Sequence, residues 1–356
     1  AVMMMLPIGT AIVYQVTQEL NKTEGDHSEE IDKFSKALIF GVGYGGTIGG
    51  LGTLIGTPPN IILAAIVNEL FGIEISFASW MMFAFPVVVS LLVIGWIMLT
   101  RFIYPIKLAK LPGGRALIRK EKEALGKISF EEKAVLGVFL FAAFFWITRS
   151  FLWQGQILTI PGINDTMIAI TAAVALFLIP SPNKGGCLLG WDVAKDVPWG
   201  ILLLFGGGLA IAAGFGSSGL ASWIGGQMSV LEGVNFLLVI LLATGMVLFL
   251  TEITSNTATA TMILPVLASL ALALNIHPFV LMVPAAMAAN CAFMLPVGTP
   301  PNAIIFATGK IKIIEMVRNG FWLNIIAMFL IVAAVYFLLP VLWGVDLTTY
   351  PDAFRD

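Results

Sequence analysis

GTLIGTPPNII, at residues 52–62, returns near the other end of the chain as LPVGTPPNAII at residues 295–305. Each copy places Gly-Thr-Pro-Pro-Asn within a long apolar stretch. Two successive prolines remove two backbone N–H donors and disfavour helix in the residue before each, so each copy predicts a helix that breaks and restarts. In a bilayer such a break is tolerated only where the freed polar groups line a cavity or find protein partners. The repeated stretch therefore predicts two interrupted helices that build a site in a membrane.

Composition agrees with a membrane protein. Hydrophobic residues make up 58% of the chain and charged residues 11%, far from the balance of a soluble domain. Uncharged runs at 75–100, 166–183, 197–231 and 233–251 reach or exceed the roughly 18 residues that a spanning helix needs. Two cysteines and two histidines predict neither a disulfide framework nor a zinc site. We expect an integral, multi-pass protein of the cell membrane.

The few basic residues predict a topology under the positive-inside rule. Loops at 21–36 and 101–133 are expected in the cytoplasm, and of the 19 basic residues only Arg149 and Arg355 face outward. Because Lys133 and Arg149 are too close in sequence for a full span between them, Arg149 is expected to snorkel or to sit among other helices. On this path the first Thr-Pro-Pro-Asn runs outward and the second runs inward, as in an inverted repeat.

A second similarity joins the two halves, because Ala1–Pro7 resembles Ala260–Pro265. Ser255-Asn256-Thr257 lies just before the later copy, so an equivalent segment is expected before Ala1. The chain is therefore expected to be a C-terminal fragment of a longer protein. Inverted-repeat secondary transporters have this organisation and hold their substrate near the middle of the bilayer.

The apolar run at 233–275 is interrupted by polar residues at 251–257. It predicts either two full spans or a re-entrant hairpin that stops halfway. The hairpin is favoured because the turn lacks Lys and Arg, and because its Ser, Asn and Thr oxygens suit a buried site. Glu252 in this turn is either a structural acid or a functional one.

The breaks offer groups for both a cation and an anion. Carbonyls at Gly298 and Thr299 are expected to leave the helical ladder and face a cation, and hydroxyl, amide and carbonyl oxygens suit sodium. A helix restarting at Asn302 would present N–H groups to an anion. No Lys, Arg or His lies at 37–100, at 253–276 or at 278–309. A multiply charged anion there needs helix ends and bound cations, which makes cation coupling a physical requirement.

Two motifs have other possible meanings. The glycines at 41–46 match a dinucleotide fingerprint, but no strand precedes them, and like those at 206–208 they are expected to pack helices. Gly216-Ser217-Ser218-Gly219 resembles the nucleophile motif of intramembrane serine proteases. That enzyme hypothesis needs a histidine base, for which His277 is the candidate, and it is weaker than the hypothesis of a protein that is not an enzyme.

Ser255-Asn256-Thr257, the two Thr-Pro-Pro-Asn breaks and PWGILLLFGGG at 198–208 together resemble the divalent anion:sodium symporters, which carry di- and tricarboxylates. The resemblance implies an all-α polytopic membrane protein: an inverted-repeat, elevator-type transporter with re-entrant hairpins and two broken transmembrane helices, forming a homodimer through scaffold helices. It implies sodium-coupled symport of succinate, malate, fumarate or citrate, with Na⁺ as coupling ion and no other cofactor. Sodium-independent exchange, and efflux of an inorganic oxyanion or a cation, are the alternatives.

The resemblance also assigns site residues. Substrate carboxylates would meet the following residues: Asn256, Thr257, Thr299 and Pro300 on one side, and Thr57 and Pro58 on the other. The second sodium would be held by Ser255, Asn256 and backbone oxygens of Thr251 and Gly298, and Gly56 would help to hold the first. The family pattern includes a first Ser-Asn-Thr, which this sequence lacks.

Four regions follow from this organisation. Residues 1–104 would form the first half of a transport domain, with the returning arm of a cytoplasmic hairpin at 1–20, a broken helix and a following helix. Residues 105–128 would form an interfacial amphipathic segment, with a soluble linker as the alternative. Residues 129–231 would be scaffold helices, and 232–356 the second half of the transport domain. Membrane lipid is an expected partner.

Overall fold

The computed structural model describes residues 2–21, 26–106, 126–153, 163–183, 185–195 and 235–354 continuously, and isolated residues or short runs within 119–123 and 200–223. Within these ranges the regular structure is helical, apart from one isolated bridge between Pro180 and Cys187. Most of the expected interfacial segment at 105–128, and most of the expected scaffold sequence at 196–231, lie outside the described residues. The predicted packing role of Gly206–Gly208 also stays a prediction, because Gly208 lies outside them.

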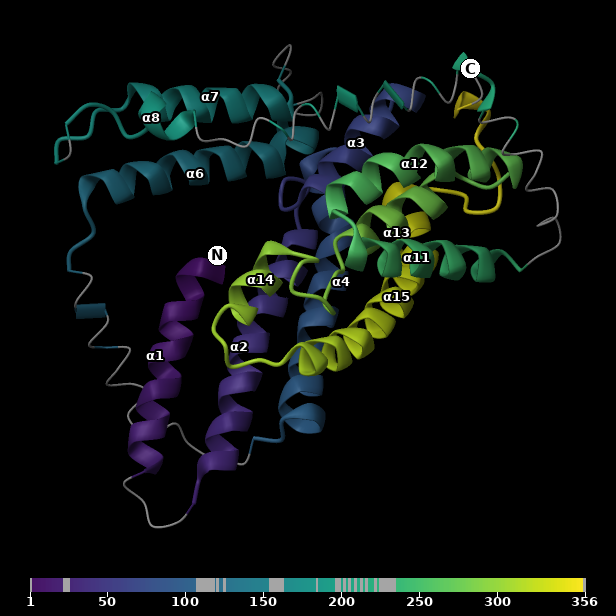
Figure 1. Ribbon diagram of the computed structural model, residues 1–356. Helices are drawn as coiled ribbons and strands as arrows, with labels where there is room; N and C mark the ends of the chain where they lie inside the picture. Colours follow the sequence, from purple (N-terminus) through teal and green to yellow (C-terminus); the bar gives the residue numbers. More distant parts are fainter. Residues whose placement is uncertain are drawn as a thin grey trace.

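The helices follow one another along the chain (Figure 1). They are α1 (Val2–Leu20), α2 (Ser28–Leu51), α3 (Pro58–Phe71), α4 (Phe77–Ile97) with its π-helical end η1 (Met98–Ile103), α6 (Phe130–Thr148) with its π-helical end η2 (Arg149–Trp153), α7 (Asp165–Leu178), α8 (Trp191–Ala194), α11 (Phe236–Ile253), α12 (Asn256–Ala273), α13 (Phe279–Ala289), α14 (Pro300–Phe306), α15 (Ile313–Trp343) and the 3₁₀ turn η4 (Asp352–Phe354).

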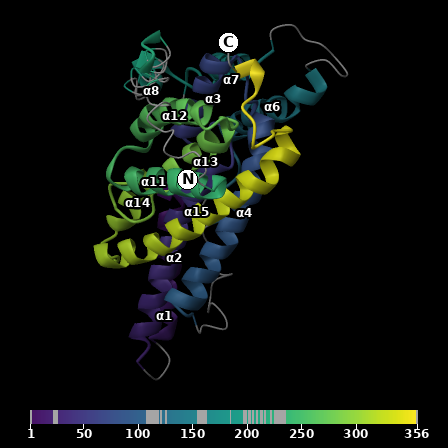
Figure 2. The same ribbon diagram turned by 90° about the vertical axis from the view of Figure 1, so that its right-hand side faces the viewer.

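Four of the described helices are long and apolar enough to cross a membrane: Phe77–Ile103, α11, α12 and α15. The expected class, an all-α polytopic membrane protein, is therefore confirmed. The centre of the helix bundle is α13, every residue of which is buried. An apolar sequence on all sides of a helix fits this position, because α13 packs against α3, α11, α12 and α15. Figure 2 shows α15 crossing α4 on the outside of this bundle.

The two interrupted helices lie against each other with opposed halves in contact. The first is α2 followed by α3, and the second is α13 followed by α14. Helix α2 packs on α14, while α3 packs on α13, as antiparallel segments do. The predicted breaks are confirmed at both positions. The predicted restart at Asn302 was two residues late, because Pro300 and Pro301 occupy the first helical positions, where their missing N–H groups cost nothing.

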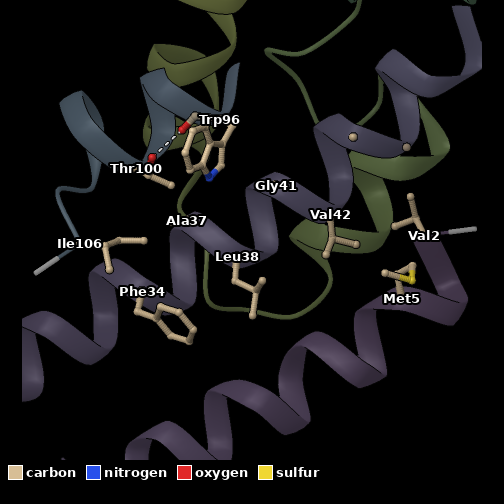
Figure 3. Close-up of a pocket in the computed structure, with 12 residues that line it drawn as sticks. Val2, Met5, Phe34, Ala37, Leu38, Gly41, Val42, Trp96, Thr100 and Ile106 are labelled. Atoms are coloured by element: carbon tan, nitrogen blue, oxygen red, sulfur yellow. Dashed lines mark hydrogen bonds between the residues drawn. The ribbon is translucent and has the colours of Figure 1, made fainter. Parts of the chain in front are cut away.

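Glycines allow the close approach of α2 to its neighbours. A Cβ atom at Gly43 would overlap the side chain of Ile305 on α14, and one at Gly46 would overlap Val2 on α1. The prediction that the glycines at 41–46 pack helices is confirmed at these two positions. An apolar groove of about 520 Å³ is lined by residues of α1 and α2 and by Trp96 of α4 (Figure 3).

Helices α6 and α7 pack on each other beside the main bundle, and a buried ion pair attaches them to it (Figure 1). Arg149 is 1% exposed, and its guanidinium contacts Glu74 Oε1 at 2.7 Å and Asp165 Oδ1 at 2.8 Å. Asp165 also accepts the N–H of Phe77 at 3.1 Å, and the Phe77 ring stacks on Trp146. Of the two expectations for Arg149, the position among other helices is therefore the one found.

Gly320→Ala is expected to destabilise the protein. Gly320 on α15 lies against the backbone of Phe293 and Met294, and a Cβ atom would overlap the Phe293 carbonyl, which cannot rotate away. We expect a loss of about 1–3 kcal/mol, typical of overpacking. Gly137→Ala on α6 is the control, because nothing lies within 4 Å of its Cβ position. Thermal unfolding in detergent measures both variants, and equal midpoints would contradict this packing.

Candidate functional site

Each break ends in a threonine that begins the next helix. Thr57 (φ −149°, ψ 149°) and Thr299 (φ −140°, ψ 151°) have extended backbones and occupy the N-cap positions of α3 and α14. The Thr299 hydroxyl accepts the N–H of Asn302 at 3.3 Å, and its carbonyl accepts that of Ala303 at 3.1 Å. The predicted release of the Thr299 carbonyl is therefore wrong, because an N-cap carbonyl accepts the first hydrogen bond of its own helix.

An asparagine after each proline pair holds the preceding loop. Asn60 donates its side-chain amide to the carbonyls of Gly50 and Thr53, at 3.3 and 2.9 Å. Asn302 donates in the same way to Ala292 and Leu295, at 2.9 and 3.0 Å. In both copies the acceptors lie 10 and 7 residues before the asparagine, and both asparagines are fully buried. The carbonyls of Gly50 and Ala292 accept no backbone N–H from the described residues, so the amides supply their hydrogen bonds, whereas those of Thr53 and Leu295 also accept the N–H groups of Gly56 and Gly298.

A third asparagine joins the two breaks. Asn290, at the end of α13, donates its amide to Asn60 Oδ1 at 2.9 Å and to the Ala286 carbonyl at 3.0 Å. Asn290 is 1% exposed and Asn60 is fully buried, so the bond lies inside the protein. The end of α13 therefore meets the first turn of α3, and the two interruptions lie side by side.

Glu252, at the end of α11, binds the backbone of the second break. Its Oε1 accepts the N–H groups of Phe293 and Met294 at 2.8 and 3.0 Å, and its Oε2 accepts those of Met294 and Leu295 at 3.1 and 3.2 Å. The amide of Asn324 on α15 donates to Oε1 at 2.6 Å. All of these donors belong to the protein itself, so the hypothesis of a structural acid is the one favoured for Glu252.

The turn between α11 and α12 lies against the same break. Thr251 Oγ1 is 2.6 Å from Asn256 Oδ1 and 2.8 Å from the Ala289 carbonyl at the end of α13. Together with the contacts of Glu252, this places the tip of the α11–α12 pair partway along the α13–α14 segment. Ser255 is exposed and begins α12 without a side-chain cap bond, which leaves its hydroxyl available to a ligand.

The residues expected to hold sodium gather at this tip and at the two breaks. A Cβ atom at Gly298 would lie 3.4 Å from Glu252 Oε2, so Gly298 is next to the tip that carries Thr251 and Asn256. In the described part of the chain no N–H donates to the carbonyl of Gly298 or of Gly56. Both carbonyls therefore have the free lone pairs that a hard cation requires.

The residues expected to bind substrate differ in burial and in whether their side chains form hydrogen bonds within the protein. Thr299 is buried and its hydroxyl caps α14. The Thr57 hydroxyl is also buried, yet none of the described residues forms a hydrogen bond with it. Four further candidates have side chains that remain at least partly exposed: Pro58, Asn256, Thr257 and Pro300.

Sequence reasoning missed the structural roles of the buried amides and proposed no ligand role for them. For Asn60 and Asn302 a signal existed, because an asparagine ends both copies of the repeated motif. Asn290 and Asn324 are single polar residues in apolar helices, and only the packing of distant segments assigns their partners.

The protease hypothesis finds no support in the side chains that it needs. Ser218 donates its hydroxyl to the Gly214 carbonyl at 2.6 Å. His277 Nδ1 accepts the N–H of Phe279 at 3.2 Å, and its ring packs on Phe279 and Phe354. The hydrogen bonds of both side chains are therefore with residues close to them in sequence, and not with each other.

Asn302→Asp is expected to lower the free energy of unfolding by about 2–5 kcal/mol, because a buried carboxylate would face two carbonyl oxygens that now receive hydrogen bonds. Asn235→Asp is the matched control, because Asn235 only accepts a bond, from the N–H of Leu237, and Asp caps equally well. Thermal unfolding of both variants in detergent checks this. A similar stability for the two variants would argue against the asparagine clamp.

Comparison with known proteins identifies relatives that are similar over nearly the whole chain. The chain is 55% identical over 352 residues to the sodium-dependent dicarboxylate transporter SdcS of Staphylococcus saprophyticus, covering 98% of this chain and 67% of that protein. It is 51% identical over 351 residues to the protein of the same name from Staphylococcus aureus strain USA300, covering 98% and 66%. The chain thus spans about two thirds of the length of these relatives.

The family match extends over both breaks and over the helices between them. The family described as the sodium:sulfate symporter transmembrane region matches residues 4–345. The family and the relatives are both named as transporters, which agrees with the expectation that the protein is not an enzyme. The chain is part of an integral, multi-pass membrane protein and belongs to the sodium:sulfate symporter transmembrane family.

Proposed function

We propose that the protein is a secondary active transporter that moves C4 dicarboxylates such as succinate, malate or fumarate, or citrate, together with sodium. The observation that carries this proposal is the pair of adjacent helix breaks, in which the carbonyls of Gly56 and Gly298 accept no N–H from the residues that the structure describes. The relatives' names supply the substrate class, and their high identity over nearly the whole chain supports its transfer to this protein.

Sodium would be held by neutral oxygens. At the second site these are the side chains of Ser255 and Asn256 and the carbonyls of Thr251 and Gly298, and at the first site Gly56 contributes its carbonyl. Support comes from the contacts of Thr251 and Glu252 with residues 289–295, which fix the hairpin tip next to Gly298. Oxygen ligands of this kind suit a hard monovalent cation.

The substrate carboxylates would meet two sets of groups. Thr57 and Pro58 lie on one break, Thr299 and Pro300 on the other, and Asn256 and Thr257 at the start of α12. Because the prolines remove the first donors of α3 and α14, side-chain hydroxyls and amides must supply much of the hydrogen bonding. With no basic side chain in these segments, bound sodium would neutralise the substrate, which couples the two fluxes.

Transport would follow an elevator mechanism in a homodimer. Residues 1–104 and 232–356 would form an inverted repeat that moves as a transport domain, with α11 and α12 as a re-entrant hairpin. Residues 129–231 would form the scaffold and the dimer contact. The matching asparagine clamps and the opposed packing of the interrupted helices support the inverted repeat. The separation of α6 and α7 from the main bundle supports two parts (Figure 1).

Uptake by the native-length protein in proteoliposomes tests the coupling. An inward sodium gradient is expected to drive succinate accumulation, which should collapse when potassium replaces sodium. Succinate exchange that does not depend on sodium would contradict symport and favour the sodium-independent exchanger. Competition by sulfate that is as strong as competition by succinate would replace the dicarboxylate by an inorganic oxyanion.

Thr57→Val is expected to weaken succinate transport while leaving the fold stable. The Thr57 hydroxyl has no partner among the described residues, so its loss costs the fold little. If it binds a carboxylate, the loss of one hydrogen bond to a charged group, about 1.5–3 kcal/mol, raises KM roughly 10- to 100-fold.

Thr244→Val is the control, because this buried hydroxyl donates to the Ile240 carbonyl within α11. It should reduce stability slightly and leave KM unchanged. A KM for the Thr57 variant equal to that of the control would remove Thr57 from the substrate site.

A further inference from the structure

The cytoplasmic ends of α4 and α15 enclose a second cavity, away from the helix breaks. It has a volume of about 470 Å³ and lies between η1 and the first turns of α15. Its polar lining residues are Tyr104, Glu315, Arg318 and Asn319, and Phe102 and Trp322 form part of its apolar wall. The positive-inside assignment of Arg101, Lys310 and Arg318 puts this end of the bundle at the inner leaflet.

Arg318 carries a positive charge that the described acidic residues leave unpaired. In the described part of the chain no carboxylate forms an ion pair with it. Glu315, one turn earlier, is already committed: its Oε1 binds Lys36 at 2.7 Å and its Oε2 accepts the N–H of Lys312 at 2.9 Å. Lys36 also pairs with Asp32 at 2.7 Å, so this cluster of charges is balanced. Among the described lining residues, the guanidinium of Arg318 is the charged group left to bind an anion.

A second donor is available beside Arg318. Tyr104 is 8% exposed, and its hydroxyl oxygen accepts the amide of Asn319 at 2.9 Å, so the hydroxyl proton still points to no described acceptor. Burial raises the pKa of Tyr104, which keeps that proton in place at neutral pH. Guanidinium and phenol groups together suit the oxygens of a phosphate.

The apolar part of the wall faces the lipid. Phe102 is 78% exposed and Trp322 is 55% exposed. Aromatic residues at this level occupy the boundary between head groups and acyl chains, and basic pockets between helices on the cytoplasmic side bind anionic head groups. The apolar groove between α1 and α2 has no charged lining residue and so lacks this combination (Figure 3).

We propose that the cavity between η1 and α15 binds an anionic phospholipid of the inner leaflet, with Arg318 and Tyr104 on its phosphate and Phe102 and Trp322 along its glycerol and upper acyl chains. The site involves neither helix break, so it is independent of which solute the protein transports. Its occupant would bridge the ends of two long helices that otherwise meet through Tyr104 and Asn319 at this level.

Native mass spectrometry of the native-length protein in detergent tests the proposal. Phosphatidylglycerol is the probe, and phosphatidylcholine measures non-specific binding. Arg318→Gln should reduce phosphatidylglycerol occupancy at least fivefold and leave phosphatidylcholine unchanged, and Arg318→Lys should restore most of it. Arg101→Gln is the matched control, because Arg101 is exposed at the same level but does not line the cavity. It should stay within twofold of the unaltered protein.

Equal losses for the Arg318 and Arg101 variants, or no loss for either, would overturn the proposal. Displacement of the lipid by millimolar inorganic phosphate would also overturn it, because an occupant held by its acyl chains should resist a free anion. Thermal unfolding of each variant confirms that exposed Arg318 has been replaced without loss of fold. The readout is bound lipid, so failure here leaves the transport proposal untouched.

Discussion

The whole site depends on satisfying main-chain polar groups where a helix stops inside the bilayer. An unpaired carbonyl or N–H in such surroundings costs several kcal/mol. The protein meets this cost with buried side chains: Asn60 and Asn302 donate to the carbonyls of Gly50 and Ala292 before each break, and Glu252 accepts three successive N–H groups. The carbonyls of Gly56 and Gly298 and the hydroxyl of Thr57 have no hydrogen-bond partner among the described residues, and these are the groups available to a ligand.

The location of the breaks could be predicted from sequence because it follows from local chemistry. Proline removes a donor wherever it stands, and two prolines in an apolar run leave few alternatives to an interrupted helix. The duplication of Gly-Thr-Pro-Pro-Asn then predicted two such helices. The opposite directions of the two interrupted helices could be predicted from the distribution of basic residues alone. The packing of α2 on α14 and of α3 on α13 agrees with this prediction.

The individual roles of the polar residues could not be predicted, because these roles depend on which distant segments of the chain are in contact. Thr57 and Thr299 are identical in their local sequence, yet one hydroxyl caps its helix and the other lacks a described partner. Glu252 was ambiguous until residues 293–295 were found around it. Asn290 gave no signal at all, although its bond to Asn60 joins the two breaks.

The hydrogen bonding of these polar groups also explains why ion coupling fits this site. The clamps and caps use neutral amides and hydroxyls, and the buried carboxylate of Glu252 already accepts five hydrogen-bond contacts from the backbone and Asn324. No basic side chain is left nearby to balance a dianion. Positive charge must therefore arrive with the substrate, and free carbonyls at Gly56 and Gly298 are suited to receive it as sodium. A basic residue placed in either break would supply that charge permanently and so remove the energetic reason for the ion to be bound with the substrate.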